Sequence, residues 1–401
     1  MKNKEYKHRV VKILEERLRE PRAHIQIILG PRQVGKSWAI TDVLHGLSCP
    51  YVYALADSEK PLPGIEWITR YWYEARDKEQ GGKRVVLVLD EIQKIKEWSS
   101  EVKRLWDEDT FEKRDICVVL LGSSSLTLQK GLSESLLGRF ETIWFMHWSY
   151  TECKEAFGFS LEDYLYYGGY PGGAKFINNN DRWRQYIMDS IIEPVLTRDI
   201  PLQTEVRNPA LLRNLFFLAC DYASQELSYR KIQGQFTDVK NVITIAGYQR
   251  MLEQTYLILG LQKWSKKDVL KRNSSPKWLP LNSGLISAVE NRSKAEVRKD
   301  GDHWGHLVEA CVGAHLVNDG KIHNYEVYYW REDKSEIDFV LRKGDKLLGI
   351  EVKTNFEKPT KQFQLFLEKN PKARVILVGP GGIKLEEFLT APLEKYLTSM
   401  K

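Results

Sequence analysis

A glycine-rich segment near the amino terminus has the residue types and spacing that bind phosphate. It fits G-x-x-x-x-G-K-[ST], with an apolar run before it and a helical pattern after it. Backbone N–H groups and the helix N-terminus would surround the β-phosphate of ATP, Lys36 would reach the β- and γ-phosphates, and Ser37 would hold Mg²⁺. A chance match in a turn is the alternative. The predicted nucleotide-binding residues are Gly30, Pro31, Arg32, Gln33, Val34, Gly35, Lys36, Ser37 and the adjoining Trp38.

Two acids, Asp90 and Glu91, end the strand-like run of residues 84–91. Acids at the carboxyl end of an inner parallel strand lie where such sheets bind ligands. We expect Asp90 to bind Mg²⁺ and Glu91 to polarise the attacking water as a general base. Glu91 capping the next helix is the alternative. Ser123 and Ser124 end a later apolar run and could contact the γ-phosphate or the water, or be ordinary turn residues.

Arg139, in the segment SLLGRF, is a candidate arginine finger. A guanidinium neutralises the charge that grows on the γ-phosphate, and a neighbouring subunit can supply it. That role would make the protein a homo-oligomer. An ordinary surface salt bridge is the equal alternative.

A second group of chemically capable residues lies near the carboxyl terminus. Asp338 and Glu351 belong to two β-like segments joined by a turn at Gly344, so a hairpin would bring the two carboxylates together with Lys353. Carboxylates that hold Mg²⁺ and a lysine that neutralises phosphate are the equipment of metal-dependent phosphodiester cleavage, and Glu309 could add a ligand. An amphipathic hairpin with solvated charges is the alternative.

A helical stretch and the basic segment after it could bind DNA. The side chains that could touch phosphates and base edges are Thr244, Tyr248, Gln249, Arg250, Lys266, Lys267, Lys271 and Arg272. The alternative is that this module only packs against the core of the protein.

The elements that must position these residues follow a clear order. Apolar strand patterns at 24–30, 51–57, 84–91, 116–125 and 141–146 alternate with helical patterns, which predicts an α/β fold with a parallel sheet of the P-loop NTPase type. The predicted domains are a P-loop ATPase core (1–148), a helical lid (149–203), a winged-helix domain with a basic linker (204–277) and a small α/β domain (278–401).

Bulk properties bound the functional class. The 401 residues are enough for about two to four domains, and the net charge of +6 permits nucleic-acid binding without requiring it. Five cysteines without a C-x-x-C pair argue against disulfides or a zinc ribbon. The charged amino terminus lacks a signal core, and no apolar run approaches the ~18 residues of a membrane span. We therefore expect a cytoplasmic protein without a membrane partner.

The ordered motifs GPRQVGKS, VLVLDEIQKIKEW, LLGSSS, SLLGRF, YLYYGGYPG, LTRDI and EIDFVL…IEVK resemble archaeal-type AAA+/STAND ATPases. These ATPases carry a winged helix and a C-terminal domain that resembles the PD-(D/E)XK, or restriction-endonuclease-like, fold. The resemblance covers nearly the whole chain and implies ATP binding and hydrolysis. It also implies that Asp338, Glu351 and Lys353 fall on nuclease motif positions. Asn282 departs from the aspartate common in the family, and Trp38 replaces the usual Thr or Ser.

Two functions remain open at this stage. The first is an ATP-dependent DNA-processing enzyme with metal-dependent cleavage at the carboxyl end. The second is a regulatory ATPase switch in which the nuclease-like domain only docks a partner. ATP and Mg²⁺ are the expected cofactors of both.

Overall fold

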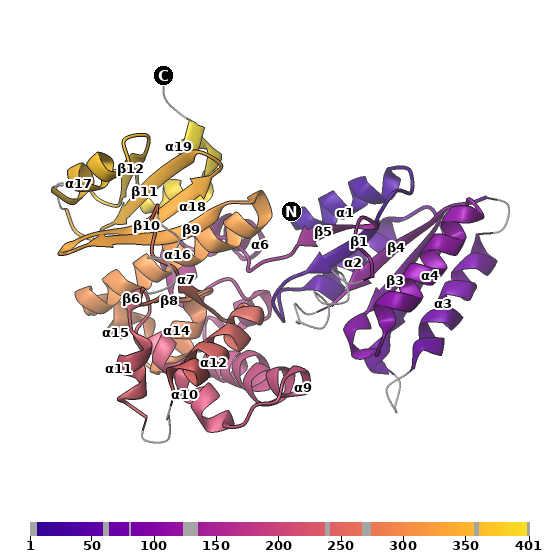
Figure 1. Ribbon diagram of the computed structural model, residues 1–401, viewed down its shortest axis with the longest axis horizontal. Coiled ribbons are helices and arrows are strands. Elements are labelled where there is room, and N and C mark those ends of the chain that lie inside the picture. The colour runs from indigo at the N-terminus through magenta and orange to yellow at the C-terminus, as the bar shows by residue number, and fades with distance from the viewer. Residues whose placement is uncertain are drawn as a thin grey trace. The chain divides into compact units, whose positions relative to one another are not determined.

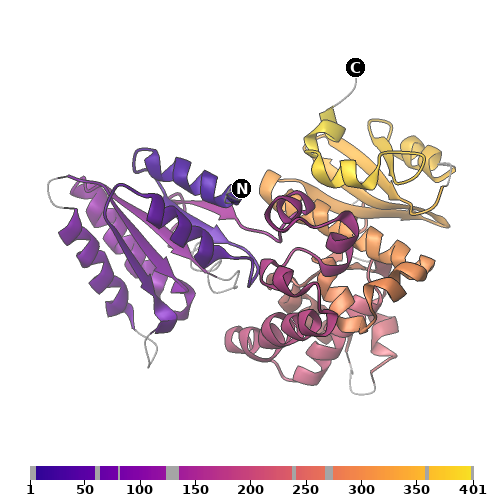
Figure 2. The same cartoon turned by 180° about the vertical axis from the view of Figure 1, so that it is seen from behind.

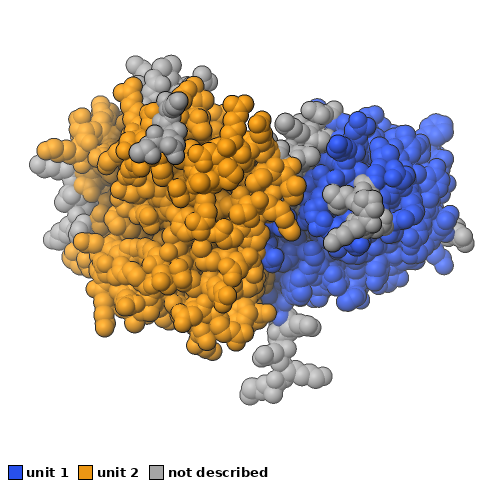
Figure 3. Space-filling view, turned by 90° about the horizontal axis from the view of Figure 1, so that it is seen from below, with its two compact units in different colours: residues 1–146 blue, residues 147–401 orange. Residues whose placement is uncertain are grey.

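The computed structural model describes residues 6–58, 64–79, 82–122, 135–236, 241–266, 274–356 and 361–398. The chain divides into two compact units, Met1–Met146 and His147–Lys401, which Figure 3 shows in blue and orange. They are called unit 1 and unit 2. The finer domain boundaries at residues 203 and 277 stay predictions.

Unit 1 is built on five parallel strands in the order β2-β3-β4-β1-β5. Every residue of β1, β3 and β4 is buried, as expected for continuous apolar strands covered on both faces. The predicted α/β fold with a parallel sheet is therefore confirmed. The strands are β1 (Ile25–Leu29), β2 (Tyr51–Leu55), β3 (Val85–Asp90), β4 (Ile116–Leu121) and β5 (Phe140–Trp144).

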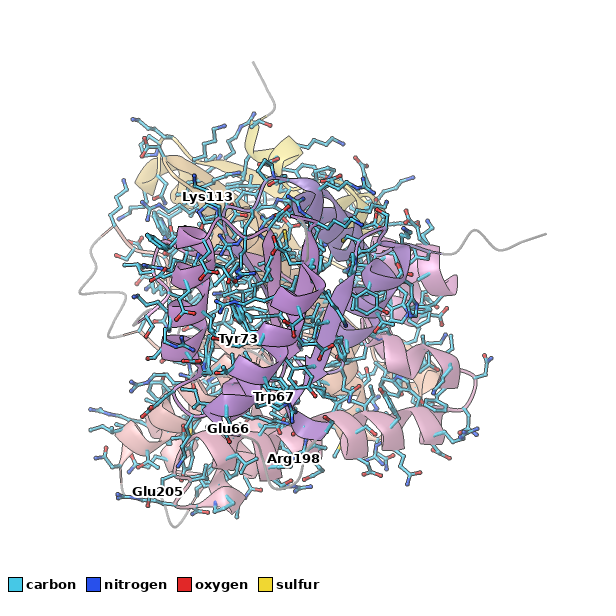
Figure 4. The ribbon with its side chains drawn as sticks, turned by 90° about the vertical axis from the view of Figure 1, so that its right-hand side faces the viewer. Glu66, Trp67, Tyr73, Lys113, Arg198 and Glu205 are labelled. Carbon is cyan, nitrogen blue, oxygen red and sulfur yellow. The ribbon has the colours of Figure 1, made fainter. Side chains whose placement is uncertain are left out.

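Helices cover both faces of this sheet (Figures 1 and 2). Trp67 and Trp72 bury their rings in the core between the sheet and two of these helices, whereas Tyr73 is 48% exposed. Figure 4 labels Trp67 and Tyr73. The α-helices described here are α1 (Arg9–Arg19), α2 (Lys36–Gly46), α3 (Ile65–Lys78) and α4 (Trp98–Phe111), with the short 3-10 turns η1 (Ala56–Ser58) and η2 (Ile92–Lys94).

Unit 2 begins with a helical section. Ser149 and Ser160 each form a capping box, which fixes where the first two helices begin. Two π-helical turns flank Pro194, whose missing N–H interrupts the regular helical ladder. The elements are α6 (Tyr150–Phe157), α7 (Leu161–Tyr167), η3 (Pro171–Phe176), α8 (Asn180–Ile187), η4 (Met188–Ile192), η5 (Val195–Asp199) and α9 (Ile200–Gln203).

A small antiparallel sheet of three strands follows, in the order β6-β8-β7. Helices precede it, separate its strands and follow it in the described part of the chain. The elements are α10 (Pro209–Asp221), β6 (Gln225–Glu226), α11 (Tyr229–Gln233), α12 (Val242–Gln254), β7 (Ile258–Leu261), β8 (Lys277–Pro280), α14 (Ser283–Glu290) and α15 (Lys294–Lys299).

The last section of unit 2 is a four-stranded mixed sheet in the order β12-β11-β10-β9. The β11–β12 pair is parallel and the other two pairs are antiparallel. A helix packs on each face, since Gly313 meets Phe339 on one side and Phe366 meets Ile337 and Val340 on the other. The elements are α16 (Gly301–His323), β9 (Glu326–Glu332), β10 (Ser335–Lys343), β11 (Lys346–Val352), α17 (Lys361–Lys369), β12 (Arg374–Val378), α18 (Leu385–Thr390) and α19 (Glu394–Thr398).

In the described part of the chain, every helix is too short or too polar to span a bilayer.

Candidate functional site

The phosphate loop connects β1 to α2 at the carboxyl edge of the parallel sheet. Gly35 has φ of 96° and Gln33 has φ of 61°, so the loop turns through left-handed backbone conformations. Gly30 lies so close to the backbone of Phe145 that an added Cβ would come within 1.8 Å of its carbonyl oxygen. Gly35 precedes α2 and gives no side-chain cap, which leaves the helix N-terminus free of a competing hydrogen bond from that residue.

The Lys36 ammonium folds back over this loop. It donates hydrogen bonds to the carbonyl oxygens of Gly30 (3.0 Å) and Pro31 (2.6 Å). Burial lowers the pKa of Lys36 to about 8, although the nearby carboxylates of Glu91 and Asp90 oppose that shift. A partly buried cation that is hydrogen-bonded to neutral carbonyls gains a direct anionic partner when a polyphosphate binds.

Asp90 is joined to the loop through Ser37. The Ser37 hydroxyl donates to Asp90 Oδ2 over 3.0 Å, and the backbone N–H of Glu91 donates to Oδ1 over 2.8 Å. Burial raises the pKa of Asp90, while its hydrogen bonds, including those from Tyr53 and Ser37, lower it. A hydroxyl and a carboxylate side by side form the all-oxygen donor set that Mg²⁺ prefers, so these two residues fit the ion.

Tyr53 is a residue that the sequence reasoning missed. Its hydroxyl donates to Asp90 Oδ2 over 2.8 Å from the neighbouring strand β2. The alternating pattern of β2 predicts only that one face of the strand is exposed. The parallel register pairs Tyr53 with Val88 of β3, and this pairing brings the Tyr53 side chain to Asp90.

Glu91 lies at the same edge of the sheet and has φ of 55°. Its side chain accepts a hydrogen bond from Gln93 Nε2 over 2.7 Å and lies 3.7 Å from the Lys94 ammonium. Although Glu91 occupies the N-cap position of η2, its side chain makes no capping hydrogen bond. The carboxylate is therefore held beside Asp90 by side chains rather than by the helix terminus.

Arg139 lies at the amino-terminal ends of the parallel strands, whereas the phosphate loop lies at their carboxyl-terminal ends. It precedes β5, whose first residue pairs with Ile25 at the start of β1, whereas the loop begins after Leu29. Its guanidinium binds Asp107 through two hydrogen bonds of 2.7 and 3.1 Å. Within one chain Arg139 therefore forms an ordinary salt bridge, which was the alternative to an arginine finger. As an arginine finger it could act only on the nucleotide of another chain. Ser123 and Ser124 lie outside the described residues.

The carboxylates that the sequence predicts to form a site near the carboxyl terminus lie together in unit 2. Phe339 of β10 pairs with Ile350 of β11, so Asp338 and Glu351 are neighbours, and an irregularity in the β9–β10 register adjoins Asp338. Asp338 Oδ2 accepts the Val352 N–H over 2.7 Å, and the Lys353 ammonium lies 3.0 Å from Glu351 Oε1. Burial raises the pKa of Glu351 to about 7, and the charge of Asp338 adds to that shift.

A lysine that the sequence reasoning placed in a basic linker belongs to this carboxylate group. Lys277 is the first residue of β8 and is only 2% exposed, so it belongs to a buried strand and not to a solvated linker. Its ammonium lies 2.7 Å from Glu309 Oε1, 3.1 Å from Glu336 Oε1 and 3.8 Å from Asp338 Oδ1. Burial alone would lower the pKa of Lys277, but the three carboxylates raise it above its ordinary value.

The residues of this group do not fit a divalent ion. Glu309 and Asp338 were predicted metal ligands, yet both lie next to the fixed positive charge of Lys277. Within the described ranges, no group of three or more His, Cys, Asp and Glu side chains has an arrangement that could hold a metal ion. The sequence could not reveal this, because Lys277 comes from a different sheet.

The predicted DNA-binding residues divide into exposed and buried ones. Tyr248 (4% exposed) and Gln249 (3%) face the interior, so their predicted contact with DNA was wrong. The Tyr248 hydroxyl accepts the Asn208 N–H, and the Gln249 amide bonds Tyr229 and Glu253. Thr244, Arg250 and Lys266 are exposed, and the rest of the set (Lys267, Lys271 and Arg272) lies outside the described residues.

Lys266 lies at a cleft of about 380 Å³ beside the Trp264 ring. Its ammonium donates to the carbonyl oxygen of Lys369 over 2.7 Å. The other cationic side chains that line the cleft are Arg342, Lys346 and Lys372.

Comparison with known proteins divides the chain into three matched segments. Residues 22–154 match the model of an AAA domain, which is consistent with an AAA-type ATPase. Residues 158–296 and 304–395 match two domains of unknown function, DUF8612 and DUF4143. A Haemophilus influenzae protein described as uncharacterized is 24% identical over 310 residues, which cover 74% of this chain and 72% of that protein.

Proposed function

We propose that this chain is an ATP-hydrolysing switch: unit 1 binds and cleaves ATP, and unit 2 binds a partner. The hydrogen bond between Ser37 and Asp90 carries the proposal, because it sets two magnesium-type oxygens beside a glycine loop and a partly buried lysine. The match of residues 22–154 to an AAA domain supports it. The misfit of the carboxylate group in unit 2 to a divalent ion favours the switch over the DNA-cleaving enzyme.

Each residue of the loop has a separate task in this proposal. Lys36 leaves the Gly30 and Pro31 carbonyls and binds the β- and γ-phosphates. Ser37 and Asp90 would hold Mg²⁺, which supplies neutralisation of phosphate charge when bound. Tyr53 fixes the rotamer of Asp90. Glu91, oriented by Gln93, accepts the proton of the attacking water.

Substitutions of Lys36 and Glu91 test this proposal in the full-length chain. Lys36→Ala removes the charge that meets the phosphates, so we expect ATP binding, measured by calorimetry, to weaken by at least about 100-fold. Glu91→Gln keeps the shape and removes the base, so ATP should stay bound while turnover falls by about 100-fold or more.

Lys83→Ala is the matched control, because Lys83 is an exposed lysine of the same unit. It should bind and hydrolyse ATP like the wild type. ATP binding and turnover of Lys36→Ala equal to those of the control would end the proposal.

We also propose that unit 2 includes a winged-helix module and a PD-(D/E)XK-like module. The first is supported by the order helix, strand, two helices and hairpin from α10 to β8. The PD-(D/E)XK-like module is supported by the order of its elements: the helix α16, the three antiparallel strands β9–β11, the helix α17 and the parallel strand β12.

The partner we propose for unit 2 is DNA. The cleft around Trp264 combines an aromatic ring, on which a base can stack, with cations that can meet phosphates. Arg250 and Thr244 add exposed polar groups on α12.

The salt dependence of DNA binding tests this partner. Reversal of charge in Arg342→Glu/Lys346→Glu should weaken binding of duplex and single-stranded DNA and lower the slope of log K against log salt by about 2. Lys384→Glu/Lys395→Glu changes the same net charge elsewhere in unit 2 and is the control. If both double variants bind DNA with wild-type affinity and slope, this cleft is not the DNA site.

A further inference from the structure

The ammonium of Lys277 occupies the centre of the carboxylate group of unit 2. It donates to Glu336 Oε1 over 3.1 Å and to the carbonyl oxygen of Asp338 over 3.4 Å, and it lies 2.7 Å from Glu309 Oε1. Glu336 and Asp338 belong to β10 and Glu309 belongs to α16, so the lysine joins a helix and a strand that pack against each other. These are the distances of an ammonium held by charge-assisted hydrogen bonds.

The backbone of β8 holds Lys277 in this position. Lys277 pairs with Leu261 on one side and with Glu226 on the other, at the centre of the three-stranded sheet. The next residue, Trp278, is fully buried and its ring N–H donates to the Leu227 carbonyl over 3.0 Å. Withdrawal of the ammonium would therefore require either a change of rotamer into packed core or the loss of strand pairing.

A divalent ion would compete with this ammonium for the same oxygens. Mg²⁺ and Ca²⁺ need direct oxygen ligands at about 2.0–2.6 Å, and Glu309 and Asp338 already face a positive charge. An ion bound between Asp338 and Glu351 would lie beside that charge without water to screen it, since these two carboxylates are 8% and 4% exposed.

We propose that Lys277 is the built-in cation of this carboxylate group, so that unit 2 takes no divalent ion there and holds its two sheets together by the ammonium instead. The proposal deepens the switch function, because a nuclease-like module without metal is left with binding. It concerns unit 2 alone and does not depend on ATP, so its failure and that of the ATPase proposal are distinguishable.

Titration of the full-length chain with Mn²⁺, without nucleotide, tests the proposal. The wild type and Asp338→Asn should bind the same number of Mn²⁺ ions by calorimetry, because the carboxylate group contributes no site. Lys277→Met removes the charge and nearly keeps the volume. It should gain one Mn²⁺ site, at least about tenfold tighter than any binding that Asp338→Asn retains.

Thermal stability supplies a second readout. Lys277→Met leaves carboxylates crowded without their cation, so its melting temperature should fall, and Mn²⁺ should raise it by more than it raises that of the wild type. Adding Glu309→Gln to Lys277→Met should also restore stability, because it removes one of the repelling charges. Lys263→Met, a loss of the same charge beside the same sheet, is the control and should show neither effect.

Three outcomes overturn the proposal. One is a Mn²⁺ site in the wild type that Asp338→Asn abolishes. The second is a folded Lys277→Met that gains no Mn²⁺ site. The third is DNA cleavage by the wild type with Mn²⁺ or Mg²⁺ that Asp338→Asn removes. If Lys277→Met fails to fold, the comparison of the wild type with Asp338→Asn decides alone, by the first and third outcomes.

Discussion

Two lysines show how the surroundings of one residue type determine its role. Lys36 is surrounded by carbonyl oxygens, and burial lowers its pKa to about 8. Lys277 is surrounded by carboxylates, and its pKa stays above the ordinary value despite complete burial. The first ammonium is hydrogen-bonded to neutral carbonyls, with the carboxylates of Glu91 and Asp90 nearby but not in contact, and it favours an incoming anion, whereas the second is paired directly with carboxylates. The same side chain therefore marks a ligand site in unit 1 and an internal ion pair in unit 2.

The glutamates follow the same rule. Glu91 is held by Gln93 and approaches the Lys94 ammonium at the edge of the sheet, where a water can reach it. Glu309 is partly buried beside Lys277, and burial raises its pKa to about 8. A general base must lie next to the phosphate site, so Glu91, which adjoins Asp90, is the better candidate.

At the scale of elements, the turn at Gly168 and Gly169 fixes how the first helices of unit 2 meet α14. Gly168 ends α7 with φ of 68° and ψ of −165°, a region that only glycine occupies at low cost. An added Cβ would lie 1.9 Å from Asn282 Oδ1. That same oxygen accepts the N–H groups of Gly169 (3.3 Å) and Gly284 (3.0 Å), so Asn282 caps α14 and ties it to the glycine turn.

We therefore predict that Gly168→Ala lowers the stability of unit 2 by about 2–4 kcal/mol, because backbone strain adds to the clash with Asn282. The shift in the denaturation midpoint followed by circular dichroism would measure it. Gly247→Ala is the matched control. Gly247 lies in α12 with open space around its Cβ position, so this change should be neutral or stabilise by up to about 1 kcal/mol. Equal midpoints for the two variants would contradict the prediction.

The sequence predicts those elements whose pattern is local. β1, β3 and β4 are short runs that are apolar apart from Gln26 and the closing Asp90, and the phosphate loop is a contiguous motif, so both can be recognised without knowing the packing. The contacts of Tyr53 with Asp90 and of Lys277 with Glu309 join residues distant in the chain, and no local pattern encodes them.

The buried residues of α12 also show what a local sequence pattern cannot predict. Tyr248 and Gln249 are polar enough to suggest a surface, but their polar atoms are satisfied inside the protein by Asn208, Tyr229 and Glu253. Only the position of the helix against β7 and α10 decides which side of it faces solvent.

At the scale of the whole molecule, the question is whether one chain contains a complete ATPase site. Lys36, Ser37, Asp90 and Glu91 lie at one edge of the sheet of unit 1, and Arg139 lies at the other. A strand of five residues separates the two edges by about 16 Å, so Arg139 cannot reach the nucleotide of its own chain. If the protein uses this arginine, the site must be completed by a second copy.

We predict that ATP turnover per chain rises with protein concentration and that two inactive variants complement each other. Arg139→Ala lacks the arginine and Glu91→Gln lacks the base, so each alone should lose at least about 90% of its activity. In a mixture, the Glu91 of an Arg139→Ala chain can meet the Arg139 of a Glu91→Gln chain, which should restore about a quarter of wild-type turnover in a randomly assorted dimer. A mixture of Arg114→Ala with Glu91→Gln is the control, since Arg114 is a guanidinium of unit 1 paired with Glu112, and its activity should simply equal that of the Arg114→Ala chains present. Turnover that is independent of concentration, with no rescue on mixing, would show instead that Arg139 serves only its ion pair with Asp107 and that the chain works as a monomer.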